Sequence, residues 1–221
     1  MYRRLLVPPA SKSFFLFGPR GTGKTTWVKS NFSNALFFDF LDDKVFSKYI
    51  ASPSRLGKNI PENFSDWIVI DEVQRIPEVL NEVHRLIENK RFKFILTGSS
   101  ARKLRRGGVN LLGGRAITHY MHPLTAVELG KDFSLSESVK YGALPSVFSE
   151  IDKEAYLAGY VSNYLQQETV QEGISRNISS FARFLETASF SQGSVLNTSE
   201  VGREAGVSRS AVEDYFCVLE D

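Results

Sequence analysis

Several features that would assign this sequence to a particular class are missing. There is a single cysteine, Cys217, so no disulfide bond can form within the chain. No apolar run approaches the roughly 20 residues that a membrane-spanning helix needs, and the apolar stretch behind the first arginines is too short for a signal peptide. The net charge is only +2, which is too weak to indicate a nucleic-acid-binding protein by itself. These absences predict a cytoplasmic protein without a membrane partner.

Two local clusters of polar residues do not indicate a function either. His119 and His122 have a spacing that metal sites use, but neither a cysteine nor an acidic pair lies nearby. We therefore interpret the histidines as core or surface residues. A short basic run is interpreted as the solvated face of a helix or loop. It consists of Arg102, Lys103, Arg105 and Arg106.

What the sequence does contain is a regular alternation of strand and helix patterns. Apolar runs predict strands at 14–17, 35–40, 67–70, 92–96 and 116–120. Helices are predicted between them at 25–30, 44–50 and 77–88. Strands that are apolar on both faces are typical of a parallel sheet covered by helices. The predicted fold class is therefore α/β, with a parallel sheet flanked by helices.

The pattern changes beyond about residue 124. Strand-like runs stop there, and residues 153–170 and 178–190 are predicted as helices. With 221 residues, the chain is long enough for one full domain and a smaller one. We expect a core at 1–130, a helical lid region at 131–192 and a partial, winged-helix-like helix-turn-helix at 193–221.

The last segment predicts two short helices around a turn. Gly206 falls at the turn, and Ser208 is a good N-cap for the second helix. In a DNA reader the first residues of that helix contact base edges. Here Arg209 is opposed by Glu213 and Asp214, so the helix is not basic. DNA contact and docking to a protein both stay open.

A glycine-rich stretch follows the first predicted strand and precedes a predicted helix. It fits G-x-x-x-x-G-K-[ST], the phosphate loop of nucleotide-binding proteins. Glycines let backbone N–H groups surround an anion, and the following helix directs its positive end at the phosphates. Lys24 would reach the β- and γ-phosphates, and the Thr25 hydroxyl would bind Mg²⁺. The predicted nucleotide-binding residues are Gly18, Pro19, Arg20, Gly21, Thr22, Gly23, Lys24, Thr25 and Thr26.

The predicted strand WIVI ends in two carboxylates. Asp71 is predicted to position Mg²⁺ together with Thr25. Glu72 is placed to take a proton from an attacking water, as a general base does. A plain Asp-Glu cap at a helix start is the alternative, and the phosphate loop makes it the weaker one.

A third polar group follows the strand FKFIL. Thr97 and Ser99 are predicted to touch the γ-phosphate or the attacking water. A turn built of small residues is the alternative for either position.

Taken together, these motifs resemble the AAA+ superfamily of P-loop ATPases. More narrowly, the chain is similar to prokaryotic ATP-binding proteins whose C-terminal part is a domain of unknown function. The resemblance implies ATP as the nucleotide and a sheet in which the FILTGSS strand lies between the phosphate-loop strand and the WIVIDE strand. The matching segments cover about residues 1–165 and are GPRGTGKTT, VIDEVQRIPEVL, FILTGSS, LLGGR, HPLTAVEL and YGALP.

The resemblance also makes Arg115, in LLGGR, the best candidate for an arginine that neutralises charge on the transferred phosphoryl group. A plain turn before an edge strand is the alternative. Arg20, inside the loop, could contact nucleotide or a neighbouring subunit. Related proteins continue into a domain that looks like the restriction-endonuclease fold, so we expect the chain to be a truncated form.

The sequence thus predicts a magnesium-dependent ATPase whose hydrolysis moves the C-terminal helical region. A nucleotide-gated module that binds DNA or a protein, with little hydrolysis, is the second hypothesis. A small-molecule kinase is a third, and the Asp-Glu pair argues against it. The pattern alone does not discriminate ATP from GTP, and it leaves homo-oligomers open.

Overall fold

The computed structural model describes residues 2–101, 104, 112–171 and 178–220, with side chains left out at 164–171, 218 and 220. All four residues of the basic run at 102–106 lie outside the described residues. Contacts between residues divide the chain into two compact units, Met1–Ser149 and Glu150–Asp221. Residues 131–149 therefore group with the first unit, and the three-part division stays a prediction.

The first unit is built on a parallel five-stranded sheet with the order β2-β3-β4-β1-β5. All five predicted strands are present, and β4 does lie between β3 and β1. The parallel fold expected from the apolar runs is confirmed. The strands are β1 (Ser13–Phe17), β2 (Leu36–Asp39), β3 (Trp67–Asp71), β4 (Lys93–Gly98) and β5 (Ala116–Tyr120).

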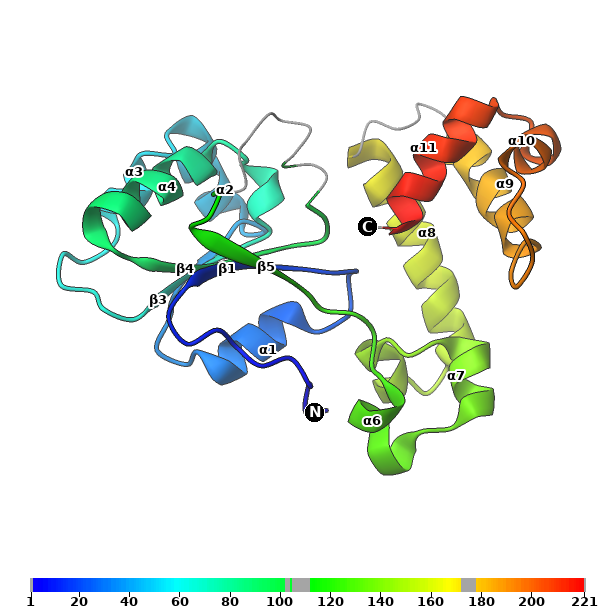
Figure 1. The fold of residues 1–221 in the computed structure, drawn as a ribbon, viewed down its shortest axis with the longest axis horizontal. Coiled ribbons are helices and arrows are strands. Elements are labelled where there is room, and N and C mark those ends of the chain that lie inside the picture. The colour runs from blue at the N-terminus through cyan, green and yellow to red at the C-terminus, as the bar shows by residue number, and fades with distance from the viewer. Residues whose placement is uncertain (1, 102–103, 105–111, 172–177, 221) are drawn as a thin grey trace. The chain divides into compact units, whose positions relative to one another are not determined.

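Helices cover both faces of this sheet, with α1 on one face and α2, α3 and α4 on the other (Figure 1). Side chains alternate along β1: Phe15 and Phe17 join one core cluster, whereas Phe14 and Leu16 join the other. This alternation explains why the strand is apolar throughout. The helices are α1 (Lys24–Asn31), α2 (Asp43–Ala51), α3 (Arg55–Lys58) and α4 (Val79–Lys90), with the 3-10 turn η1 (Val73–Arg75) after β3.

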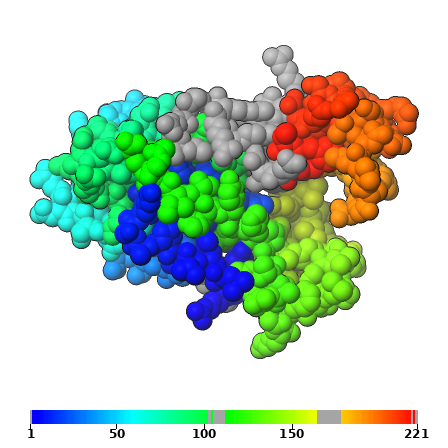
Figure 2. All heavy atoms as spheres, in the orientation of Figure 1, coloured from blue at the N-terminus to red at the C-terminus, as the bar shows by residue number. Residues whose placement is uncertain are grey.

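The chain after β5 folds into short helices that hold the N-terminal segment. Glu128 Oε1 accepts a hydrogen bond from the Leu5 N–H at 2.7 Å and lies 3.2 Å from Arg4 Nε. Figure 2 shows the N-terminal segment (blue) on the surface beside green residues that include β5. The helices are α6 (Ala126–Leu129), η2 (Gly130–Asp132), α7 (Leu135–Tyr141) and η3 (Pro145–Ser149).

The second unit is helical in its described residues. Its core consists of Phe181, Phe184, Val201, Ala205, Val212 and Tyr215. The predicted turn is present: Gly206 adopts a left-handed conformation with φ 67°, and the Ser208 hydroxyl accepts from the Ala211 N–H at 3.2 Å. The helices are α8 (Lys153–Gln171), α9 (Ile178–Ser189), α10 (Thr198–Ala205) and α11 (Arg209–Glu220). In the described part of the chain, no helix combines the length and apolarity that crossing a membrane requires.

Candidate functional site

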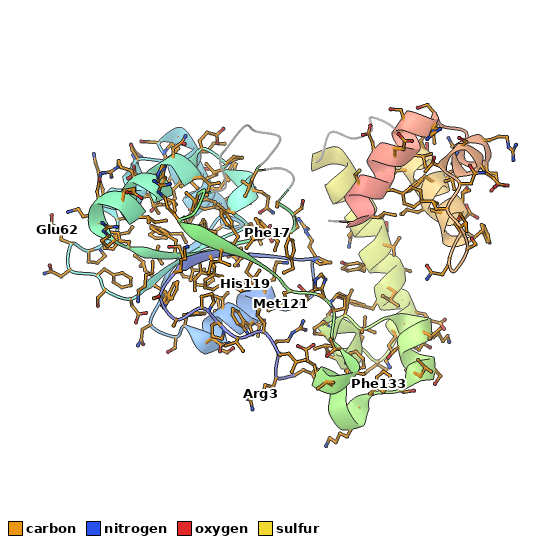
Figure 3. All side chains as sticks on the ribbon, in the orientation of Figure 1. Arg3, Phe17, Glu62, His119, Met121 and Phe133 are labelled. Carbon is orange, nitrogen blue, oxygen red and sulfur yellow. The ribbon has the colours of Figure 1, made fainter. Side chains whose placement is uncertain are left out.

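The glycine-rich loop joins the carboxyl end of β1 to the first residue of α1. Gly21 and Gly23 have φ angles of 80° and 87°, values that residues with a side chain rarely adopt. At Gly18, with φ 151°, a Cβ atom would lie 2.1 Å from the carbonyl oxygen of Met121. Met121 is fixed there because its N–H donates to the Phe17 carbonyl at 2.7 Å; both side chains are labelled in Figure 3. The three glycines are thus required by backbone conformation and by space.

Lys24 places its ammonium group inside this loop. The side chain is buried, and Nζ donates to the carbonyl oxygens of Gly18 at 2.6 Å and Pro19 at 3.0 Å. Because Lys24 is the first residue of α1, the amino end of that helix also faces the loop. An anion in the loop would meet a positive charge and helix N–H groups together.

Thr25, Asp71 and Thr97 form a bonded group beside the loop. The Thr25 hydroxyl donates to Asp71 Oδ2 at 2.8 Å, and the Thr97 hydroxyl donates to the other carboxylate oxygen. Asp71 ends β3 and Thr97 lies in β4, and both are buried. Hard oxygen donors of this kind are the ligands that Mg²⁺ prefers. The residues present therefore fit the predicted magnesium site.

Glu72 follows Asp71 in a left-handed conformation with φ 56°. This backbone conformation is unfavourable for any residue other than glycine. It persists only where neighbouring groups hold the residue in place. The Glu72 N–H donates to the Thr97 hydroxyl at 3.3 Å, and the carboxylate accepts from Gln74 Nε2. Gln74 Nε2 also lies 3.2 Å from the Ser99 hydroxyl. The predicted residues of both strands thus meet in one network.

Two neighbouring cavities open at this site. The loop cavity has a volume of about 510 Å³ and is lined by the loop, by Glu72 and by Leu41 and Pro145. The N-terminal cavity, of about 670 Å³, is lined by residues 2–4, by Trp27 and by the helices after β5. Gly23, Thr26 and Pro145 line both cavities. The two cavities adjoin, so a ligand with a phosphate end at the loop has room for a second group beside it.

A sequence profile of the AAA domain family matches residues 10–130, which is more than half of the chain. The chain belongs to this family. A second profile, for a domain of unknown function, matches residues 132–221. The predicted resemblance is therefore confirmed: the chain is a P-loop AAA+ protein with a C-terminal domain of unknown function.

Two curated relatives of this AAA protein are uncharacterized proteins of Mycobacterium bovis and Mycobacterium tuberculosis. Each is 25% identical over 211 residues, which make up 93% of this chain and 47% of the relative. The chain thus spans about half the length of the curated relatives it matches. Among solved structures, the Orc1 protein of Aeropyrum pernix in complex with DNA shows 14% identity and a TM-score of 0.38, over 96% of this chain and 78% of that one.

The AAA domain does not bring every predicted residue to the site. Arg115 immediately precedes β5, and Ala116 pairs with Ser13, so Arg115 lies at the amino edge of the sheet. The loop follows the opposite edge, about 16 Å away for a strand of this length. The Arg115 guanidinium instead bonds the Glu88 carboxylate at 2.5 Å and lowers the pKa of that group. Arg20, in contrast, lines the loop cavity.

Gln74 is a residue of the hydrogen-bond network that sequence reasoning missed. It lies within the segment VIDEVQRIPEVL, which supported the family resemblance, but no chemical role followed from a glutamine there. Its partner Ser99 is 25 residues away in the sequence. The His119 ring packs edge-on against Phe14, with centroids 5.8 Å apart.

Proposed function

We propose that this chain binds ATP with Mg²⁺ and hydrolyses it to ADP and phosphate. The observation that carries the proposal is the bonded group at the phosphate loop, in which Thr25 and Thr97 both donate to Asp71 and the Glu72 N–H donates to Thr97. A phosphate loop alone would support nucleotide binding. The adjacent carboxylate of Glu72 adds a group that can accept a proton from water.

Lys24 and the loop N–H groups would hold the phosphates, while Thr25 and Asp71 would hold Mg²⁺. The metal ion would supply positive charge against the phosphate oxygens. Glu72 would take a proton from water as the water oxygen forms a bond to the γ-phosphorus and the bond to the ADP oxygen breaks. Thr97 and Ser99 would contact the γ-phosphate or the water.

The two cavities support a nucleotide rather than an inorganic phosphate. The loop cavity would take the phosphates, and the N-terminal cavity beside it would take the nucleoside. Membership in the AAA domain family supports ATP over GTP. Arg20 is the arginine that we place near the phosphates, since it lines the loop cavity whereas Arg115 lies at the other edge of the sheet.

A nucleotide-gated module that docks to a protein through α10 and α11 is the second candidate. Residues 150–221 contain five basic and twelve acidic residues. The described arginines of α10 and α11 form ion pairs with glutamates of the same helices. Arg203 lies 3.8 Å from Glu200, and Arg209 bonds Glu213 at 2.8 Å. DNA binding depends on Lys and Arg that neutralise phosphates. The charge therefore favours a protein partner over DNA.

Phosphate release from ATP and Mg²⁺ by the parent chain, with and without duplex DNA, tests these proposals. We expect turnover without DNA, and a rate that changes by less than about twofold when DNA is added at physiological salt. Strong stimulation by DNA would contradict the protein-docking proposal. A chain that binds ATP tightly without releasing phosphate would favour the nucleotide-gated module over the ATPase.

A further inference from the structure

Gln74 connects the candidate general base to the neighbouring strand. It lies in η1, two residues after Glu72, and is 8% exposed. Its Nε2 donates to the Glu72 carboxylate oxygen Oε2 and to the Ser99 hydroxyl, the latter at 3.2 Å. One amide group therefore links the carboxylate that follows β3 to a residue that follows β4.

This arrangement is unfavourable for stability taken by itself. The other amide atom of Gln74, Oε1, is buried and has no hydrogen-bond partner among the described residues. A buried acceptor without a partner costs free energy, because it has lost its hydrogen bonds to water. An apolar side chain of the same length would avoid that cost. The glutamine is thus better explained by what its N–H group holds than by packing.

Gly98 shows how closely the amide is packed. A Cβ atom at this position would lie 2.3 Å from Gln74 Oε1, and the next side chain, Phe17, would be at an ordinary 3.4 Å. Gly98 is not among the residues with positive φ, so its backbone conformation does not demand glycine. Glycine is required there because the Gln74 amide occupies the space that a Cβ atom would need.

We propose that Gln74 is a positioning residue that holds the Glu72 carboxylate where it can accept the proton of the attacking water. This role rests on the proposed hydrolysis. Glu72 has a left-handed backbone that its neighbours must fix. The Thr97 hydroxyl fixes its N–H group, and the Gln74 amide fixes its carboxylate.

The first test replaces Gln74 with methionine, which has a similar length and no polar group. We expect Gln74→Met to keep or raise the Tm without nucleotide, and to leave the Kd and the KM for ATP within about twofold of the parent. We expect kcat to fall about tenfold to a hundredfold, as for a misplaced reacting group. A kcat loss at constant KM marks an interaction made only in the transition state.

The second test uses Gly98→Ala, whose Cβ atom should displace the Gln74 amide. This variant should lower kcat in the parent chain. In a Gln74→Ala background it should cause no further loss, because the amide that it displaces is already absent. If the kcat losses of Gly98→Ala and Gln74→Ala instead add in the double variant, Gly98 does not act through the Gln74 amide. That result would overturn this part of the proposal.

The outcomes separate this role from the function on which it rests. A parent that hydrolyses ATP while Gln74→Met has the parental kcat overturns the role of Gln74 and leaves the proposed function intact. A kcat loss that occurs only together with a lower Tm assigns Gln74 to structure and also overturns the role. A parent that binds ATP and releases no phosphate overturns the hydrolysis, and the role of Gln74 with it.

Discussion

Glu72→Gln is expected to lower kcat for ATP hydrolysis by about 10²- to 10⁴-fold, the range that a general base contributes. Glutamine keeps the shape of the side chain, and its carbonyl oxygen can still accept from Gln74 Nε2 as the carboxylate does. What is lost is the ability to accept a proton from water. Because Lys24 and the loop are untouched, the affinity for ATP should stay within about twofold of the parent. Steady-state phosphate release and equilibrium titration with ATP measure the two quantities.

A matched control is Glu78→Gln. Glu78 is an exposed residue at the start of α4, outside the bonded group at the loop. This substitution should leave both kcat and affinity at the parental values. If Glu72→Gln turned over ATP as fast as Glu78→Gln, the general-base role of Glu72 would be wrong.

Glu128→Ala is expected to lower the free energy of unfolding by about 3–5 kcal/mol, the cost of removing one partner of a buried ion pair. The side chains of Arg4 and Glu128 are only 8% and 4% exposed. Burial lowers the pKa of the Arg4 guanidinium, because removal from water disfavours the charged form. Glu128 also accepts from the N–H groups of Leu5 and Thr125, at 2.7 and 2.9 Å. The substitution removes all of these bonds and leaves the guanidinium buried without its counterion.

Glu200→Ala provides the comparison, since it breaks an exposed Arg–Glu pair on α10. Exposed pairs contribute about 0–1 kcal/mol, so this variant should unfold almost as the parent does. Urea unfolding of both variants measures the difference. Equal losses in the two variants would contradict the view that the Arg4–Glu128 pair holds the N-terminal segment. Because residues 2–4 line the N-terminal cavity, weaker ATP binding should accompany the loss at Glu128.

The sheet and the phosphate loop could be predicted because their signals are local. Phe14 to Phe17 is apolar at every position, as a strand buried on both faces must be. The glycine spacing before Lys24 indicates a loop with positive φ angles, and the φ angles of Gly21 and Gly23 agree with it. The strand order came from the family resemblance, since local patterns do not specify which strands become neighbours.

The remaining features depend on contacts between distant parts of the chain. Arg115 bonds Glu88, which is 27 residues away in the sequence, and no local pattern indicated this contact. Gln74 meets Ser99 only because β3 and β4 are neighbours. Arg4 and Glu128 are 124 residues apart in the sequence, and the segment HPLTAVEL, which contains Glu128, did not indicate a partner at Arg4. Each of these residues acquires its role through packing, which a single sequence does not display.

The central claim is that the loop after β1 holds the phosphates of ATP. It is tested most directly by calorimetric titration of ATP with Mg²⁺ into the parent chain, Lys24→Ala and Lys12→Ala, where Lys12 is an exposed control. We predict that the parent and Lys12→Ala bind alike, and that Lys24→Ala binds at least about a hundredfold more weakly, since hydrogen bonds to charged groups contribute about 1.5–3 kcal/mol each. A parent that binds no ATP, or a Lys24→Ala variant that binds as the parent does, would contradict the account.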